Sequence, residues 1–404
     1  MKKPFFSVVL PTRNRSKHLP LAIASVLNQT FGDFELIVSD NCSDDATPQV
    51  AQSFDDKRIK YFRSDKPLTI GDSYELGLSY ASGEYITFIA DDDAYVPCSL
   101  EHVKKVIDDL SAEIVSFGIA AYYRDRDFAF DREIGPGTLT FNSFTGRVTK
   151  FDSRQAIDLL FQSYGLNDLD RNDDFIIAYL CNAVYHHTVF SRIKAIRNEM
   201  FAATPADLYL AAAVMFATDE YYCLDEPLYV WHNWAENTTA SPYKKGNEFR
   251  EHYEKLLAGE PLRFTPLKFA LHHNCCINAM LQAKDDFDKS DNVKVNWADY
   301  YVFSYNNLMV LKNTNVDVSK EIQEFIDILK QEPADIQKQV NERIHNFKFT
   351  VKQSFRKFPL AFRVAKSLLD RQRSQSRVFV NGRDHGFDNV LDATNFLETY
   401  RLGK

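Results

Sequence analysis

The sequence predicts an α/β protein with a mostly parallel sheet, followed by a helical C-terminal region. Over about the first hundred of its 404 residues, short apolar runs alternate with segments whose apolar residues recur at helical spacing. This alternation is typical of a doubly wound parallel sheet. From about residue 248 onward the apolar pattern is helical. We therefore expect an α/β domain over residues 1–245 and a helical region over residues 246–404.

The expected elements follow from apolar runs and turn residues. Runs bounded by polar or turn residues predict strands at 5–10, 35–39, 59–63, 85–90, 113–122, 220–224 and 228–231. Apolar residues three and four positions apart predict helices at 19–27, 43–54, 74–80, 99–110 and 207–216. Ser43 is expected to cap the second of these helices. Three further helices are expected in the C-terminal region, at 269–282, 297–311 and 322–347.

Composition excludes several functional classes. The formal net charge of −8 opposes nucleic acid as the main partner, because phosphate binding needs a basic face. No apolar run approaches the roughly 20 residues that cross a bilayer, and Met1 to Pro4 lead into a strand rather than a signal peptide. The six cysteines lack CxxC spacing, so we expect reduced thiols in a cytoplasmic protein.

Polar side chains follow three of the predicted strands. The first strand ends in Pro11-Thr12-Arg13-Asn14-Arg15, the second in Asp40-Asn41, and the fourth in Asp91-Asp92-Asp93. In open α/β sheets ligands bind beyond the carboxyl ends of the strands, so these groups are expected at one rim. A cationic loop beside several carboxylates suits a metal-bound, multiply anionic ligand.

The acidic triplet Asp91 to Asp93 predicts a divalent cation. Three adjacent carboxylates repel one another unless a cation offsets their charge, and hard oxygen ligands suit Mg²⁺ or Mn²⁺. The alternative is a solvated loop, which explains most isolated acidic triplets. Its position after a buried strand, beside two other polar strand ends, favours the metal site.

These motifs resemble the family-two inverting glycosyltransferases of the GT-A fold. The similarity lies in the strand and loop 7–15, in Val38-Ser39-Asp40-Asn41-Cys42-Ser43-Asp44-Asp45, and in Ala81-Ser82-Gly83-Glu84-Tyr85-Ile86 followed by the triplet. It covers residues 5–100 well, 200–240 loosely and the helical tail not at all. Two positions depart from the commoner pattern, which has an acidic residue at Ala90 and an asparagine near Ser73 or Glu75.

The resemblance implies roles for specific residues. Asp40 would bind the uracil or other base, and the cationic loop would line the nucleotide pocket, with Arg15 preferred over Arg13 as the inward-facing side chain. The donor-binding residues implied in this way are Pro11, Thr12, Arg13, Arg15, Asp40, Asp91 and Asp92. The implied metal ligands are Asp91, Asp93 and His232, in a segment that would close over the diphosphate. A purely structural role for His232 remains open.

The resemblance places the acceptor-activating carboxylate after the α/β core, which makes Asp207 the candidate general base. It lies in the first turn of a predicted helix, with Thr204 as its cap, so an equally simple role is that of a partner for the helix dipole. A second acidic group is better explained as a solvated loop; it consists of Asp168, Asp170, Asp173 and Asp174. The pairs His186-His187 and His272-His273 lack metal-ligand spacing and are expected to be structural.

The predicted function is metal-dependent, inverting transfer of a hexosyl or N-acetylhexosaminyl group. The expected donor is a nucleotide-sugar, UDP-linked, and the expected acceptor is a glycan or lipid-linked hydroxyl in surface polysaccharide synthesis. One alternative is a sugar nucleotidyltransferase, although the loop after the first strand lacks the expected glycines. Another is a non-catalytic sugar-nucleotide or glycan-binding module, which Ala90 keeps open. No GxxxxGK[ST], GxGxxG or GxSxG motif occurs.

A basic segment runs from Arg343 to Arg377. It contains ten basic residues against the single acid Asp370, a local net charge of +9, with phenylalanines interleaved. This composition predicts peripheral binding to an anionic membrane surface at the inner face of the membrane. The alternative is a basic helix that packs on the acidic α/β domain.

Overall fold

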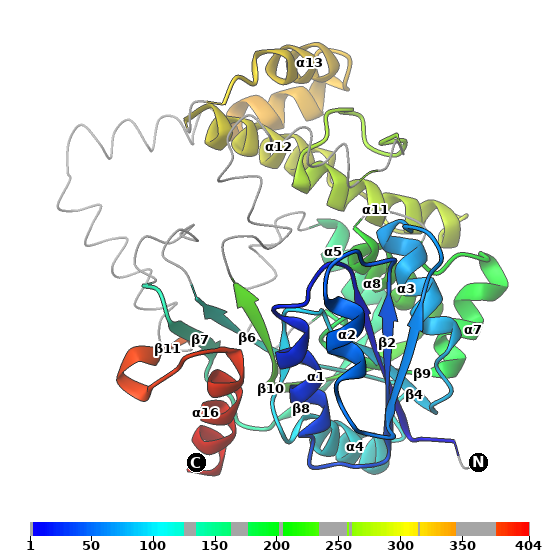
Figure 1. The fold of residues 1–404 in the computed structure, drawn as a ribbon. Helices are drawn as coiled ribbons and strands as arrows, with labels where there is room; N and C mark the ends of the chain where they lie inside the picture. The colour runs from blue at the N-terminus through cyan, green and yellow to red at the C-terminus, as the bar shows by residue number, and fades with distance from the viewer. Residues whose placement is uncertain are drawn as a thin grey trace.

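The computed structural model describes residues 3–124, 135–162, 177–201, 205–233, 257, 261–313, 316–344 and 377–403. It shows an α/β body with a sheet at its centre and a group of helices at one end (Figure 1). Among the described helices, none combines the length and apolar character that a bilayer span requires.

The sheet is mixed, with a parallel half and an antiparallel half. Its strand order is β11-β7-β6-β9-β4-β1-β2-β3, and β10 joins it through β5, β6 and β8. The strands of the parallel half are β1 (Phe6–Thr12), β2 (Phe34–Asp40), β3 (Ile59–Arg63) and β4 (Tyr85–Phe88). The others are β5 (Ala94–Tyr95), β6 (Ile114–Tyr123), β7 (Thr138–Asn142), β8 (Val148–Asp152), β9 (Ala183–His186), β10 (Glu220–Asn233) and β11 (Arg377–Asn381).

Helices cover both faces of the parallel half. Successive side chains of a strand point to opposite faces, so Val8 and Leu10 of β1 enter one core while Val9 enters the other. The first core includes α1 (Leu19–Leu27), α4 (Ser99–Leu110) and α16 (Val390–Leu402). The second includes α3 (Ile70–Ser79), α5 (Ser153–Gln162), α7 (His187–Ile196), α8 (Ala206–Ala217), α11 (His272–Phe287), α12 (Trp297–Asn313) and α13 (Ser319–Leu329). Strands β1, β2 and β4 are buried on both faces, which explains why their sequences are continuous apolar runs rather than alternating patterns.

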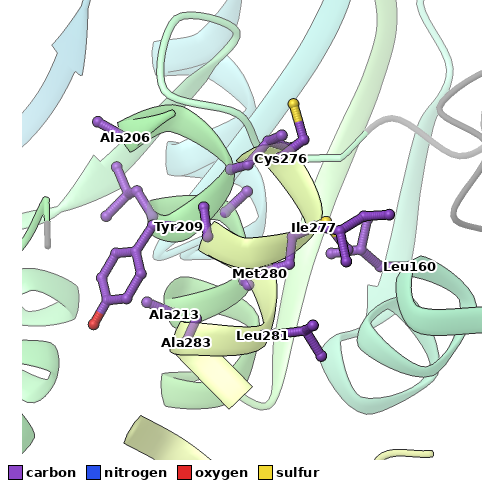
Figure 2. Packing of buried hydrophobic residues seen from close by; sticks show 14 of the residues in the cluster. Leu160, Ala206, Tyr209, Ala213, Cys276, Ile277, Met280, Leu281 and Ala283 are labelled. Carbon is purple, nitrogen blue, oxygen red and sulfur yellow. The ribbon is translucent and has the colours of Figure 1, made fainter. Parts of the chain in front are cut away.

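Helix α8 joins the sheet to the C-terminal helices. Its residues from Leu208 to Met215 are all buried, and small residues such as Ala213 let α11 approach it closely. Figure 2 shows Tyr209 and Ala213 of α8 packed beside Met280 and Ala283 of α11. The Tyr209 hydroxyl also donates to Asp286 Oδ2 at 2.8 Å. The two helices therefore share one continuous core.

Four local expectations differ from the structure. The helix predicted over 322–347 is interrupted: α13 ends at Leu329, and helix resumes at 334–344 after Pro333, which cannot continue the hydrogen-bond ladder. The strands predicted at 220–224 and 228–231 are one strand, β10, with irregular pairing around Pro227. Helix α2 (Thr47–Gln52) begins after Ser43, whose hydroxyl accepts the Asn14 N–H instead of capping it.

The fourth difference concerns the C-terminal region, which is not wholly helical. Strand β11 pairs antiparallel with β7 at the edge of the main sheet, and α16 packs on the same body. Strand β11 carries Val378 and Val380 at alternating positions, with Val380 buried. The boundary at residue 245 lies outside the described residues, as does the basic segment apart from Arg343, Ile344 and Arg377. That division stays a prediction.

Glu35 supplies a pH-dependent part of the stability. Its side chain is buried in β2, where it pairs with Lys60 and accepts hydrogen bonds from Ser7 Oγ at 2.5 Å and Ser82 N at 2.8 Å. Burial raises the pKa of Glu35, but Lys60 and then the hydrogen bonds from Ser7 and Ser82 outweigh it, so the pKa falls below the usual 4.5. A carboxyl with a lowered pKa stabilises the fold above its unfolded pKa.

We predict that Glu35→Gln lowers the free energy of unfolding at pH 7 by about 1–3 kcal/mol, because it leaves buried hydrogen-bonding groups poorly satisfied. The deficit should shrink as the pH falls below 4.5 through the folded pKa of Glu35, where the wild-type carboxyl is protonated. Urea unfolding of both proteins between pH 3 and pH 7 measures it, with the exposed Glu84→Gln as control. An equal deficit at all pH values would contradict this account.

Candidate active site

The loops after β1 and β2 form one connected rim. Asn14 adopts a left-handed conformation (φ 56°), its N–H donates to Ser43 Oγ at 3.0 Å, and its side-chain oxygen accepts Asp44 N–H at 2.9 Å. The next amide, of Arg15, donates to Thr47 Oγ1 at 2.9 Å. These bonds hold the cationic loop in one place at the carboxyl ends of the strands, as the sequence predicted.

Asp40 lies beneath this rim and is fully buried. Its Oδ1 accepts Ser43 N–H at 2.9 Å, and its Oδ2 accepts the Tyr61 hydroxyl at 2.6 Å, with Arg63 Nε 3.5 Å away. Burial and then Asp40 raise the pKa of Tyr61, so the hydroxyl keeps its proton and donates. Asp40 therefore orders the rim through both carboxylate oxygens. Its role in base recognition stays a prediction.

Asp91 faces the cationic loop. Arg15 Nε lies 3.4 Å from Asp91 Oδ1, whereas Arg13 is exposed to solvent and Pro11 is half-buried. Burial and then the neighbouring Asp92 charge raise the pKa of Asp91 to about 7, and Arg15 offsets part of the increase. The preference for Arg15 over Arg13 as the inward-facing cation agrees with this geometry. Thr12, at the end of β1, is buried in the same region.

Asp93 is held by strand β10. Its Oδ2 accepts the Tyr229 hydroxyl at 2.5 Å, and its Oδ1 accepts the His232 N–H at 2.8 Å. The Tyr229 oxygen in turn accepts the Ala90 N–H at 3.2 Å. Burial and then Asp92 raise the pKa of Asp93 well above its usual value, although both donors lower it. Asp93 is thus fixed by two hydrogen bonds, while burial and the neighbouring charge of Asp92 oppose its ionisation.

His232 fixes the triplet from its other side. Its Nδ1 lies 3.0 Å from the Asp92 carbonyl oxygen, and because a carbonyl can only accept, Nδ1 carries the hydrogen. Burial lowers the pKa of His232 to about 4, so the ring is neutral at pH 7. These contacts agree with the structural role that was left open for His232, and its role as a metal ligand stays a prediction. A metal contact by His232 would have to use Nε2.

The carboxylates fit a divalent cation of the magnesium type. No group of three histidine, cysteine, aspartate or glutamate side chains surrounds a common point within the described ranges. Mg²⁺ sites of this kind need only one or two protein carboxylates, because substrate phosphates and water complete the shell. Asp91 and Asp93 would supply those carboxylates; burial and then the charge of Asp92 raise the pKa of both, and a bound cation would offset this repulsion.

The cavity beside the triplet measures about 360 Å³, which is within the size range of small-ligand pockets. It brings together Asp93 from the triplet, Asp207 from α8, Trp231 from β10 and Cys276 from α11. The remaining lining residues are Ile119, Tyr179, Leu180, Cys181, Asn182, Pro205, Leu208 and Tyr229. The helical region therefore contributes directly to the wall of this cavity.

Asp207 lies in the first turn of α8 with its side chain exposed. Its Oδ1 accepts the Leu208 N–H at 2.9 Å, so the expected interaction with the helix terminus is present. The carboxyl also lines the cavity, where desolvation raises the pKa of Asp207 and makes this carboxylate a stronger base than a free one. The N-cap is Pro205; the expected cap Thr204 and the acidic group 168–174 lie outside the described residues.

Tyr229 and Cys181 are site residues that the sequence did not single out. The Cys181 thiol is half-buried beside the triplet, and burial followed by the Asp93 charge raises its pKa, which keeps it protonated. Tyr229 could have been identified from its place in a predicted buried strand, because a buried tyrosine hydroxyl needs a hydrogen-bond partner. His186 caps α7 through Thr188 N–H, which agrees with its predicted structural role.

These features define the class of the protein: an α/β sheet whose strand ends carry a cationic loop beside an acidic triplet, as in GT-A glycosyltransferases. Residues 7–190 match the family described as "Glycosyl transferase family 2". The chain thus contains a family 2 glycosyltransferase domain, and the resemblance drawn from its motifs is confirmed.

Known relatives are similar over short segments. A 94-residue segment is 48% identical to GalNAc(5)-diNAcBac-PP-undecaprenol beta-1,3-glucosyltransferase of Campylobacter jejuni, covering 22% of this chain and 30% of that protein. A 95-residue segment is 34% identical to UDP-Glc:alpha-D-GlcNAc-diphosphoundecaprenol beta-1,3-glucosyltransferase WfgD of Escherichia coli, covering 24% and 38%. The similarity spans less than two fifths of either relative. Among solved structures, S. aureus TarS is similar with a TM-score of 0.47 at 16% identity, over 84% of this chain and 50% of that chain.

We predict that Tyr229→Phe weakens activity by roughly 10–100-fold, the usual effect of removing a group that orients a metal ligand. Loss of the hydroxyl leaves Asp93 Oδ2 and the Ala90 N–H without their shared partner. Steady-state kinetics at varied Mn²⁺ measures the effect. Tyr222→Phe is the matched control, because its hydroxyl donates to the exposed Glu220 on the same strand rather than to a residue of the triplet. Equal kinetics for the two variants would contradict the role given to Tyr229.

Proposed function

We propose that the protein transfers a sugar from a UDP-sugar to a hydroxyl of a lipid-linked glycan, with inversion and with Mn²⁺ or Mg²⁺ as cofactor. The observation that carries the proposal is that Asp93 and Asp207 line one cavity. Asp93 belongs to the metal-type triplet, and Asp207 is a carboxylate with a raised pKa. A donor held at the triplet would present its sugar to an acceptor activated at Asp207.

The proposed reaction is a single in-line displacement. The acceptor hydroxyl oxygen forms a bond to the anomeric carbon while the bond from that carbon to the diphosphate oxygen breaks. Asp207 takes the hydroxyl proton, and the nucleoside diphosphate leaves with the electron pair. Attack from the side opposite the leaving group inverts the anomeric configuration, and no covalent intermediate on the enzyme is needed.

The donor would bind at the rim formed by the loops after β1 and β2. Arg15 beside Asp91 supplies positive charge for the diphosphate, and Asp91 with Asp93 would hold the cation. When bound, the cation neutralises charge that develops on the departing diphosphate. The Tyr229 and His232 bonds keep Asp93 in place without any rearrangement during the reaction.

The choice of donor and acceptor class is supported by the relatives. Their names specify undecaprenol-linked acceptors in both cases and UDP-Glc as the donor in one. A lipid-linked acceptor lies in a membrane. The basic segment from Arg343 to Arg377 would bring the enzyme to it by binding an anionic membrane surface.

Asp207→Asn should lower kcat by about 10²–10⁴-fold while the Kd for UDP stays within twofold of wild type, since the base contacts the acceptor rather than the nucleotide. Transfer assays with UDP-glucose and an undecaprenyl-diphosphate-linked sugar, paired with calorimetry of UDP binding, separate the two effects. Asp219→Asn, an exposed aspartate beyond the other end of α8, is the control. Near-normal turnover by Asp207→Asn would reject the assignment, and absence of any UDP binding by wild type would reject the donor class.

Flotation with liposomes tests the membrane association. The full chain should float with vesicles that contain an anionic lipid and remain below with neutral vesicles, because the attraction depends on surface charge. The triple variant Arg356→Glu, Lys357→Glu and Arg363→Glu should lose flotation. Binding by wild type at low salt that does not depend on anionic lipid, or no binding at all, would end this part of the proposal.

A further inference from the structure

The last described segment, residues 377–403, returns to the sheet far from its neighbours in sequence. Strand β11 pairs with β7 through five residue pairs from Arg377↔Asn142 to Asn381↔Thr138. Helix α16 then packs against β10, β5 and α1 (Figure 1). Strand β5 directly follows the acidic triplet, and β10 donates hydrogen bonds to it. The C-terminal segment therefore packs on the two strands that position the candidate active site.

A tight turn places one aromatic side chain of the segment over the sheet. Gly382, in the 3₁₀ turn η2 (Gly382–His385), donates its N–H to Gly137 O at 2.8 Å and accepts the Phe387 N–H at 2.8 Å. A Cβ on Gly382 would collide with both the Gly137 carbonyl and the Phe387 ring. Only glycine allows this approach, which holds the Phe387 ring against the neighbouring strand.

A chain of aromatic contacts runs from this ring to the active site. The Phe387 ring meets Tyr122 edge-on at 6.2 Å, and Tyr122 stacks on His232 at 5.7 Å with an angle of 26° between the rings. Tyr122 and His232 are also register partners on β6 and β10. On its far side, Phe387 packs against Phe396 of α16 at 5.5 Å. Tyr122 is 2% exposed, so the stack leaves little room for the His232 ring to turn.

The orientation of the His232 ring matters because its Nδ1 must face the Asp92 carbonyl oxygen. The backbone N–H of the same residue, whose direction is set by β10, donates to Asp93 Oδ1, so the ring and the backbone of His232 contact neighbouring residues of the triplet. We propose that Tyr122 and Phe387 are positioning residues, through which the C-terminal segment fixes His232 and completes the donor site. This inference rests on the proposed donor-binding function and adds a requirement for residues 377–403 to it. Such indirect positioning typically changes affinity by 10–100-fold.

The test compares single-substitution variants of the full chain. Phe387→Leu and Tyr122→Leu remove a ring, Tyr122→Phe keeps the ring and loses only the hydroxyl, and Phe379→Leu changes an aromatic side chain of β11 that is 50% exposed and outside the stack. For each, we would measure the Kd for UDP with Mn²⁺ by calorimetry, the donor KM and kcat, and the Tm.

We expect Phe387→Leu and Tyr122→Leu to raise the Kd for UDP and the donor KM by roughly 10-fold. Tyr122→Phe and Phe379→Leu should stay within twofold of wild type. Because Phe387 is only half-buried, its replacement leaves a folded protein, and Phe387→Met provides a second variant without the ring. Wild-type Kd in both Phe387 variants overturns the inference while the proposed function stands. A wild type that binds no UDP contradicts the proposed function and the inference together.

Discussion

The acidic triplet depends on a set of hydrogen bonds that reach it from a strand far along the chain. Asp93 receives the Tyr229 hydroxyl and the His232 amide, across sequence separations of 136 and 139 residues. These donors compensate in part for burying a carboxyl next to two others, which otherwise raises its pKa strongly. Strand β10 can supply them only because it pairs with both β5 and β6. The position of Asp93 therefore depends on the pairing of β10 with β5 and β6.

The sequence predicts the groups at the strand ends, and it does not predict what holds them. Asp40 and the triplet follow apolar runs that predict strands. Parallel strands bring their carboxyl ends to one edge of the sheet, and this holds for any conformation of the loops. Tyr229 and His232 reach Asp93 only through tertiary pairing, which no local pattern records. Ser43 illustrates the same limit. Its position suits an N-cap, but its hydroxyl binds the Asn14 amide because the two loops meet in space.

The C-terminal region shows which signals are weak in a sequence. Pro333 lies between two helices. Because the apolar residues on both sides keep helical spacing, the sequence pattern predicted one continuous helix. Strand β11 has the period-two pattern of an edge strand but is short, with only Val380 buried. Helix α11 was predicted as part of a separate helical region over 246–404, whereas its Cys276 lines the same cavity as Asp207. Helix α11 thus forms part of the wall of this cavity.

A crystal structure of the full chain with UDP and Mn²⁺ would test the central claim most directly, because anomalous scattering locates the metal without reference to the protein. The account predicts a manganese peak between the diphosphate and the carboxylates of Asp91 and Asp93, with Tyr229 and His232 still bonded to Asp93. UDP or manganese bound elsewhere, with no carboxylate of the triplet in contact, would contradict it.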